Sequence, residues 1–178
     1  MTASVVRVEI REATAGDADR MATIYTLAAR AAWADFIPGV GALEAEGDRF
    51  AAGLAEPGAT TLVAEWGAEV AGFAVILVPS KEPIPGAGEL DMLYTHPELW
   101  GKGAGRELLQ AAVERLRALG CTSGVLWTAE ANRRPRRIYE AAGWQPDGTR
   151  RTREWRGSTF EELRYRRDLP ADRAASGA

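Results

Sequence analysis

Three glycines in a short turn, Gly101, Gly103 and Gly105, lie between a predicted strand and a predicted helix. Glycine lets the backbone approach a ligand closely, and successive N–H groups in such a turn can point to one place. The first turn of the following helix adds the positive end of the helix dipole. The stretch 100–106 therefore suits a phosphate or a diphosphate, although glycine-rich turns also occur for structural reasons alone.

The spacing of these glycines excludes two common phosphate-binding motifs. A Walker loop needs a glycine, four further residues and then Gly-Lys-Ser/Thr, but His96 and Gly103 stand at the positions that require Gly and Ser/Thr. A dinucleotide fingerprint, Gly-x-Gly-x-x-Gly, would need a glycine at Arg106 or at Leu108.

The elements that must position this turn follow from hydrophobic periodicity and from turn residues. Alternating, β-branched stretches predict strands, and apolar residues at helical spacing predict helices. The order β-α-α-β-β-β-α-β-α-β-β indicates one mixed α/β domain with helices covering a largely antiparallel sheet. The predicted strands are 5–11, 60–66, 70–78, 89–95, 124–128, 144–155 and 160–169, the predicted helices are 21–31, 41–54, 106–119 and 132–142, and 79–88 is a predicted loop.

Two stretches resemble motifs of one known superfamily. Residues 93–109, with the turn at their centre, resemble motif A of the GCN5-related N-acetyltransferases (GNAT), and residues 132–144 resemble motif B. The resemblance covers roughly 5–169 and implies the GNAT fold with a splayed central strand pair. Trp100 stands where Arg or Gln is usual, so one side-chain contact to phosphate is missing from the pattern.

The resemblance implies acetyl-CoA as the cosubstrate. Its pyrophosphate would bind the backbone N–H groups of 101–106, and its pantetheine arm would pair with Leu93 and Thr95 as a neighbouring strand does. A bulge in that strand would open a slot for the thioester, and main-chain donors around 93–95 would stabilise the tetrahedral intermediate. The expected cofactor-binding residues are Leu93, Tyr94, Thr95, Gly101, Lys102, Gly103, Ala104, Gly105, Arg106, Asn132, Arg136 and Arg137.

Three residues are candidates for acid and base catalysis. Tyr139 lies two helical turns after Asn132, and the matching family tyrosine protonates the leaving thiolate; alternatively it is a packing residue. Glu89 and Asp91 share a strand face, and a base is needed because only the free amine attacks a thioester. Glu89 is preferred, acting directly or through water, with Asp91 second; the alternative is that both face solvent.

The arginines of 133–137 and two aromatic residues are candidates for ligand binding because of their positions in the sequence. The arginines of 133–137 could meet the 3′-phosphate of coenzyme A or form a solvated helix face. Trp33, Phe36 and the 80–88 loop are candidates for the acceptor site, with core packing as the alternative for the two aromatic residues.

Composition sets the remaining expectations. The chain has 178 residues, a net charge of -3, one cysteine and one histidine. This composition therefore predicts no zinc site, no other metal, no nucleic-acid partner and no membrane segment. The lone Cys121 excludes an internal disulfide and fits a cytoplasmic location. We expect one N-acetyltransferase domain over 1–169 and a disordered tail over 170–178, and family members are often homodimers.

The functional prediction is direct transfer of acetyl from acetyl-CoA to a primary amine of a small molecule or peptide. The alternative is a non-catalytic acyl-CoA-binding or sensor module on the same fold. The acceptor, the acyl preference and the oligomeric state are not encoded in these motifs.

Overall fold

A computed structural model describes residues 7–170. The tail predicted over 170–178 therefore lies, apart from Pro170, outside the described residues, as does the start of the first predicted strand. Seven strands form one sheet in the order β1-β2-β3-β4-β5-β7-β6. The strands are β1 (Val8–Glu12), β2 (Ala59–Trp66), β3 (Glu69–Leu77), β4 (Ala87–Thr95), β5 (Ser123–Ala129), β6 (Gln145–Trp155) and β7 (Ser158–Asp168), and the helices are α1 (Ala18–Trp33), α2 (Gly47–Leu54), α3 (Ala104–Ala118) and α4 (Arg133–Ala141).

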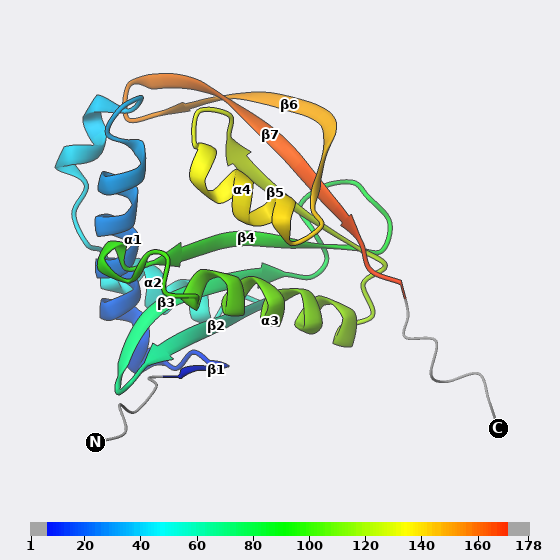
Figure 1. The fold of residues 1–178 in the computed structure, drawn as a ribbon, viewed down its shortest axis with the longest axis horizontal. Coiled ribbons are helices and arrows are strands. Elements are labelled where there is room, and N and C mark those ends of the chain that lie inside the picture. Colours follow the sequence, from blue (N-terminus) through cyan, green and yellow to red (C-terminus); the bar gives the residue numbers. More distant parts are fainter. Residues whose placement is uncertain (1–6, 171–178) are drawn as a thin grey trace.

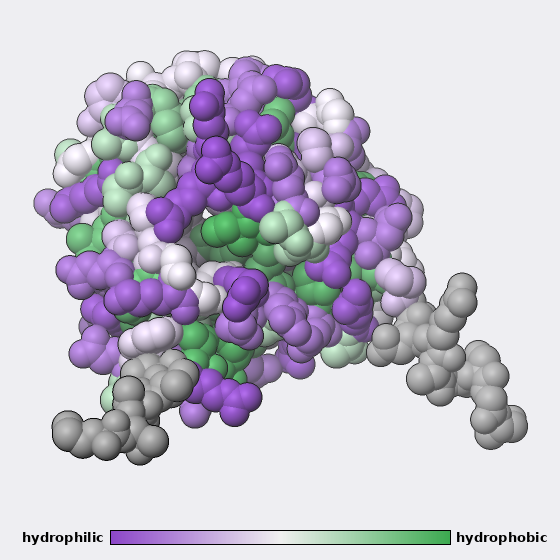
Figure 2. Space-filling view, in the orientation of Figure 1, coloured by the Kyte–Doolittle hydropathy of each residue, from purple (hydrophilic) through white to green (hydrophobic). Residues whose placement is uncertain are grey.

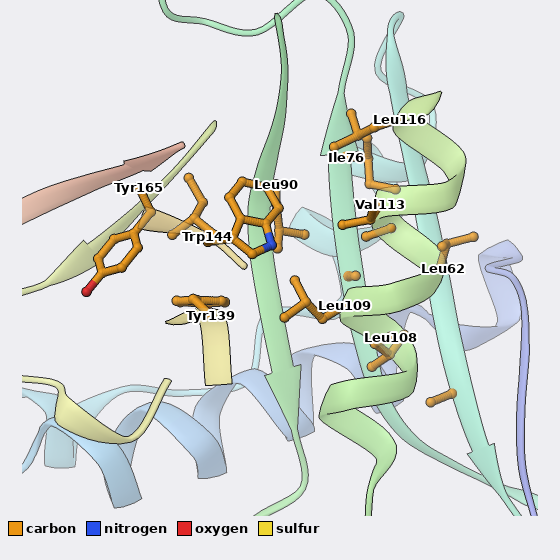
Figure 3. Packing of buried hydrophobic residues seen from close by; sticks show 14 of the residues in the cluster. Leu62, Ile76, Leu90, Leu108, Leu109, Val113, Leu116, Tyr139, Trp144 and Tyr165 are labelled. Carbon is orange, nitrogen blue, oxygen red and sulfur yellow. The ribbon is translucent and has the colours of Figure 1, made fainter. Parts of the chain in front are cut away.

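The helices cover both faces of this sheet (Figure 1). A hydrophobic core lies on each face of the sheet, because successive strand residues point to opposite faces. In β2, for example, Leu62 belongs to one core and Val63 to the other. One core joins α1 and α2 to the sheet through residues such as Phe50 and Phe73. The other core, under α3, includes Leu108 and Leu116 (Figure 3). The predicted mixed α/β fold with a largely antiparallel sheet is confirmed.

The element boundaries that differ from the sequence prediction include those of the second helix and of β4. The second helix was predicted over 41–54, but a 3-10 helix occupies Pro38–Ala42 and α2 begins only at Gly47. The loop predicted to extend to Gly88 ends earlier, because β4 begins at Ala87. Gly88 belongs to the strand, opposite Gly124 of β5. A Cβ on Gly88 would lie 2.3 Å from Cδ2 of Leu116, so the missing side chain lets α3 pack closely on the sheet.

The central strands β4 and β5 pair in parallel and then separate. Their pairing is confined to 87–89 against 123–125, with Gly88 opposite Gly124, while the strands continue to Thr95 and Ala129. Trp144 is fully buried (Figure 3). It packs on Gly124, where a Cβ would lie 2.8 Å from the indole. In β4, Leu90 pairs with Ile76 and Met92 with Val75, so Asp91 is the extra residue of a bulge. The splayed strand pair is therefore present.

Within residues 7–170, no helix combines the length and the hydrophobicity needed to cross a membrane.

Candidate active site

The space between the separated ends of β4 and β5 forms a cavity of about 870 Å³. Figure 2 shows the surface hollowed near the middle of the face that carries α3 and α4, with hydrophobic colour inside the hollow and hydrophilic colour around it. The walls come from α1, β4, the glycine turn, β5, the start of α4 and the β6–β7 pair. Of the predicted site residues, the cavity is lined by Trp33, Glu89, Asp91, Leu93, Tyr94, Thr95, Gly101, Lys102, Gly103, Gly105, Arg106, Asn132 and Tyr139.

The glycine turn leaves several backbone N–H groups open. Gly101 and Gly103 have φ values of 82° and 100°, a conformation that favours glycine. Within residues 7–170, the N–H groups of Gly101, Gly103, Ala104 and Gly105 have no hydrogen-bond acceptor. The other two N–H groups are used internally: Lys102 N donates to Leu99 O at 3.2 Å and Arg106 N to Gly103 O at 2.9 Å. The first turn of α3 therefore presents open donors to an anion, but the Arg106 N–H is not one of them.

Trp100 and Arg134 link this turn to α4. The Trp100 Nε1 donates to Thr95 O at 3.0 Å, so the indole is fixed at the end of β4. The Arg134 guanidinium carbon lies 4.3 Å from the centre of the Trp100 ring, and both side chains line the cavity. This stacked pair occupies the place where the sequence pattern lacked a polar side chain.

The structure does not bring Arg136 or Arg137 to the cavity. Arg136 donates from Nε to the Tyr165 hydroxyl at 3.1 Å and from Nη1 to Glu130 O at 2.9 Å. Arg137 is exposed and is not a lining residue. The reason is helical geometry: residues advance by about 100° each, so Arg134, Pro135, Ile138 and Tyr139 together form the face of α4 that lines the cavity, and Arg136 and Arg137 lie on the other side of the helix.

One edge of β4 faces the gap unpaired. His96 N donates to Ala71 O at 2.8 Å, which sets the side to which each residue points. Because backbone groups alternate along a strand, the N–H and C=O of Leu93 and Thr95 point away from β3 and toward the gap. Thr95 O already accepts the Trp100 indole N–H. The main-chain groups of Leu93 are therefore the open pair on this edge.

Tyr139 and Asn132 enter the cavity from the α4 side. Tyr139 is only 7% exposed, and its ring centre lies 6.1 Å from that of Tyr165. Its hydroxyl has no hydrogen-bond partner within residues 7–170. Burial raises the pKa of the Tyr139 hydroxyl, so the group is a protonated donor throughout the physiological range. The Asn132 side chain makes no capping bond to α4 and is free for other contacts.

The two predicted carboxylates lie in the cavity wall and are held differently. Glu89 is 5% exposed, and its Oε2 accepts from Ser80 Oγ at 3.1 Å and from Lys81 N at 2.9 Å. Asp91, the bulge residue, pairs with Lys81 Nζ at 2.9 Å. Burial lowers the pKa of Lys81, but the hydrogen bond and the charge of Asp91 outweigh it, so the net shift is upward. Asp91 is thus ion-paired with Lys81, whereas Glu89 forms no ion pair within residues 7–170.

The wall of the cavity that α1, β6 and β7 form is aromatic and rich in arginine. Trp33 lines it and meets Trp155 edge to face, with ring centres 5.3 Å apart. Phe36 does not line the cavity but packs on Phe160, which does, at 5.8 Å. Sequence reasoning missed the lining residues Arg49, Trp127, Arg151, Arg153 and Glu162.

A sequence signal for part of this wall was present. Arg151, Arg153 and Trp155 alternate along β6, so they share one face of the strand and all line the cavity. Both arginines bind the buried Glu162 of β7, Arg151 Nε at 2.7 Å and Arg153 Nη1 at 3.2 Å. Within residues 7–170, no group of three or more His, Cys, Asp or Glu side chains is placed to hold a metal ion.

Comparisons with known proteins agree with this geometry. The family model described as "Acetyltransferase (GNAT) family" matches residues 24–144. A mycothiol acetyltransferase of Propionibacterium freudenreichii subsp. shermanii is 32% identical over 109 residues, which is 60% of this chain and 35% of that protein. The chain thus matches about a third of the length of this curated relative.

Two solved structures share the fold at low sequence identity. The PaiA N-acetyltransferase of Thermoplasma acidophilum, in complex with coenzyme A, is 18% identical, with a TM-score of 0.73 over 91% of this chain and 99% of that one. The yncA product of Salmonella typhimurium, with its cofactor acetyl-CoA, is 23% identical, with a TM-score of 0.72 over 96% of this chain and 98% of that one.

Proposed function

The chain belongs to the acetyltransferase (GNAT) family, and from this premise we propose that it transfers the acetyl group of acetyl-CoA directly to a primary amine of a small molecule or peptide. One observation carries the proposal: the cavity between β4 and β5 begins at a turn with open N–H groups and contains a buried carboxylate and a buried tyrosine. The coenzyme A and acetyl-CoA bound in two structures of the same fold support the donor.

The diphosphate of the donor fits the turn at the start of α3. The open N–H groups of 101, 103, 104 and 105 and the positive end of the α3 dipole would bind it. Lys102, Arg106 and Arg134 line the same end and add positive charge. We therefore assign the phosphate contacts of α4 to Arg134, in place of Arg136 and Arg137.

The pantetheine arm fits along the unpaired edge of β4. The C=O of Leu93 and the N–H of Thr95 would pair with it, and Asn132 would bind it from α4. The Leu93 N–H is the donor best placed for the carbonyl oxygen of the acetyl group, on which negative charge develops during attack. Acetyl-CoA supplies the thioester; the chain supplies the donors around it.

The remaining steps move protons. The amine nitrogen forms the new C–N bond, the C–S bond breaks, and the proton that the nitrogen loses is balanced by one that the sulfur gains. Glu89 would accept the proton from the amine, directly or through water, and Asp91 is second because Lys81 neutralises it. Tyr139 would donate to the sulfur. Its raised pKa keeps the phenol protonated, so that the proton is available as negative charge develops on the sulfur.

Two measurements on the same sample test the proposal. Millimolar acetyl-CoA should raise the Tm, because a ligand that binds only the folded state stabilises it by RT ln(1+[L]/Kd). An amine panel should then release free thiol in steady turnover. Stabilisation without thiol release would identify a non-catalytic acyl-CoA-binding module, and the absence of both would refute the proposal.

A further inference from the structure

Two charged groups in the acceptor half of the cavity lack a partner of opposite charge. Glu89 is held by a hydroxyl and a backbone N–H, and within residues 7–170 no cation lies within ion-pair distance of it. Arg49 likewise forms no ion pair with any carboxylate of the described residues, and its guanidinium carbon lies 6.0 Å from the centre of the Tyr25 ring. The other charges of this half are matched, because Lys81 pairs with Asp91 and Glu162 pairs with two arginines.

Arg153 adds a second, partly open cation to the wall of the cavity. Only its Nη1 is engaged, at 3.2 Å from Glu162, and its other nitrogens have no acceptor within the described chain. Burial raises the pKa of the Tyr25 hydroxyl, and the charges of Arg49, Arg153 and Arg156 act against that rise. Of these three arginines, Arg49 and Arg153 line the cavity together with Tyr25.

We infer that the acceptor is a primary amine that also carries an anionic group, a carboxylate or a phosphonate, on the same molecule. This inference rests on the proposed function. The amino group faces Glu89, and the anionic group binds Arg49 and Arg153 by charge-assisted hydrogen bonds. The perpendicular Trp33 and Trp155 rings contact the carbon skeleton between the two groups.

This arrangement also rejects other amines. A diamine or polyamine would place its second positive charge against Arg49 and Arg153, and like charges brought together in a partly enclosed site are unfavourable. A neutral amine would leave the Arg49 guanidinium without a partner. Selectivity thus comes from both attraction and repulsion.

The test is a set of matched acceptors. Each α- or ω-amino carboxylate, and each ω-aminophosphonate, is compared with its uncharged carboxamide or with the alkylamine that lacks the acid. Thiol release is measured at saturating acetyl-CoA, below the pKa of every amine and corrected for the fraction of free amine. We expect kcat/KM to be about tenfold or more higher for the anionic member of each pair, mainly through KM.

Variants locate the source of the preference. Arg49→Gln and Arg153→Gln should each reduce it about tenfold while kcat changes little, and Arg153→Lys should keep part of it because the charge remains. Arg150→Gln is the matched control: Arg150 is on the same strand but pairs with Glu130 outside the cavity, so the preference should be unchanged.

The outcomes separate this inference from the proposed function. Turnover with equal rates for both members of each pair, or with cationic amines preferred, would overturn the inference and leave the proposed function standing. A preference that survives both glutamine variants would also overturn it. No thiol release with any amine, despite stabilisation by acetyl-CoA, would refute the proposed function and this inference with it.

Discussion

The Arg134 guanidinium stacks on the Trp100 indole at 4.3 Å, while the same indole donates a hydrogen bond to Thr95 O. These two contacts join the end of β4, the glycine turn and the first turn of α4. A cation held over an aromatic face is fixed in position and keeps its N–H groups free for an anion. The pair thus places a positive charge beside the open N–H groups of the turn.

Removing that charge should weaken donor binding. We expect Arg134→Gln to raise the KM for acetyl-CoA about tenfold, because a charge-assisted contact to phosphate and a cation–π contact of about 0.5–2 kcal/mol are lost. Steady-state kinetics with varied acetyl-CoA measures this. Arg137→Gln, an exposed arginine on the same helix, is the control and should leave KM unchanged. Equal effects of the two variants would remove Arg134 from the site.

Tyr139→Phe should lower kcat by about a hundredfold, since positioned proton donors contribute roughly 10²–10⁴ in rate. The KM for acetyl-CoA should hardly change. Tyr165→Phe is a matched control, because the Tyr165 hydroxyl donates to Glu140 at 2.6 Å and lies outside the cavity. That variant should lose stability but keep its turnover. Full activity of Tyr139→Phe would leave the tyrosine as a packing residue.

The role of Glu89 can be tested through pH. Glu89→Gln should slow turnover near neutral pH, where the amine is mostly protonated, and recover as pH rises toward the pKa of the amine itself, about 8–10. Asp91→Asn should have a smaller effect, because Lys81 already neutralises Asp91. Profiles of kcat/KM against pH that coincide for the parent protein and Glu89→Gln would exclude this base.

Asp17 should control acid stability. Its carboxylate accepts two hydrogen bonds from Arg11, at 2.8 and 2.9 Å, and the Thr14 N–H at 2.7 Å. The Arg11 bond, opposed in part by burial, holds the pKa of Asp17 well below its usual range. A carboxyl group whose pKa is depressed by folding stabilises the folded state at a pH above its pKa in the unfolded chain, which is about 4. That stability is lost as the pH falls below this value.

We therefore expect Asp17→Asn to lower the free energy of unfolding at pH 7 by about 1–3 kcal/mol, because a nearly buried charged hydrogen-bond network is broken. Urea unfolding measures this as a lower midpoint concentration. The difference should shrink as pH falls below about 4. A constant difference between pH 7 and pH 2 would show that the carboxylate charge is not its source.

Two glycines make a paired stability test. Gly124→Ala should destabilise the fold by about 1–3 kcal/mol, because its Cβ would lie 2.8 Å from the buried Trp144 ring. Gly53→Ala, in α2 with nothing within 4 Å, should stabilise by about 0.5–1 kcal/mol through helix propensity. Urea unfolding of both variants checks this. A neutral Gly124→Ala would mean that Trp144 does not need the glycine.

Local sequence patterns account for the parts of the fold and of the site that could be predicted. Alternation and helical spacing predicted the order of strands and helices, because each element buries one face. Motif spacing likewise singled out the turn, Glu89 and Tyr139, all of which line the cavity. These features depend on residues close together in the chain.

Features that depend on tertiary packing were not predictable in the same way. The choice of Arg134 over Arg136 depends on which face of α4 meets the cavity, and the place of Arg49 depends on how α2 packs on α1. The sequence prediction places Gly88 in a loop, whereas the structure places it in β4. Its role is to let Leu116 of α3 pack closely on the strand, and this contact joins residues that are distant in sequence. Arg151 and Arg153 alternate visibly, but only β7 pairing places their face over the cavity.

The central claim is that the turn at the start of α3 binds the diphosphate of coenzyme A through open backbone N–H groups. NMR of protein labelled with ¹⁵N-glycine tests it directly by following the amides of Gly101, Gly103 and Gly105 during a titration with coenzyme A. The account predicts large downfield proton shifts at these three amides with one shared Kd, and none at the remote Gly53 and Gly67. Saturating coenzyme A that leaves the three turn amides unmoved would contradict it.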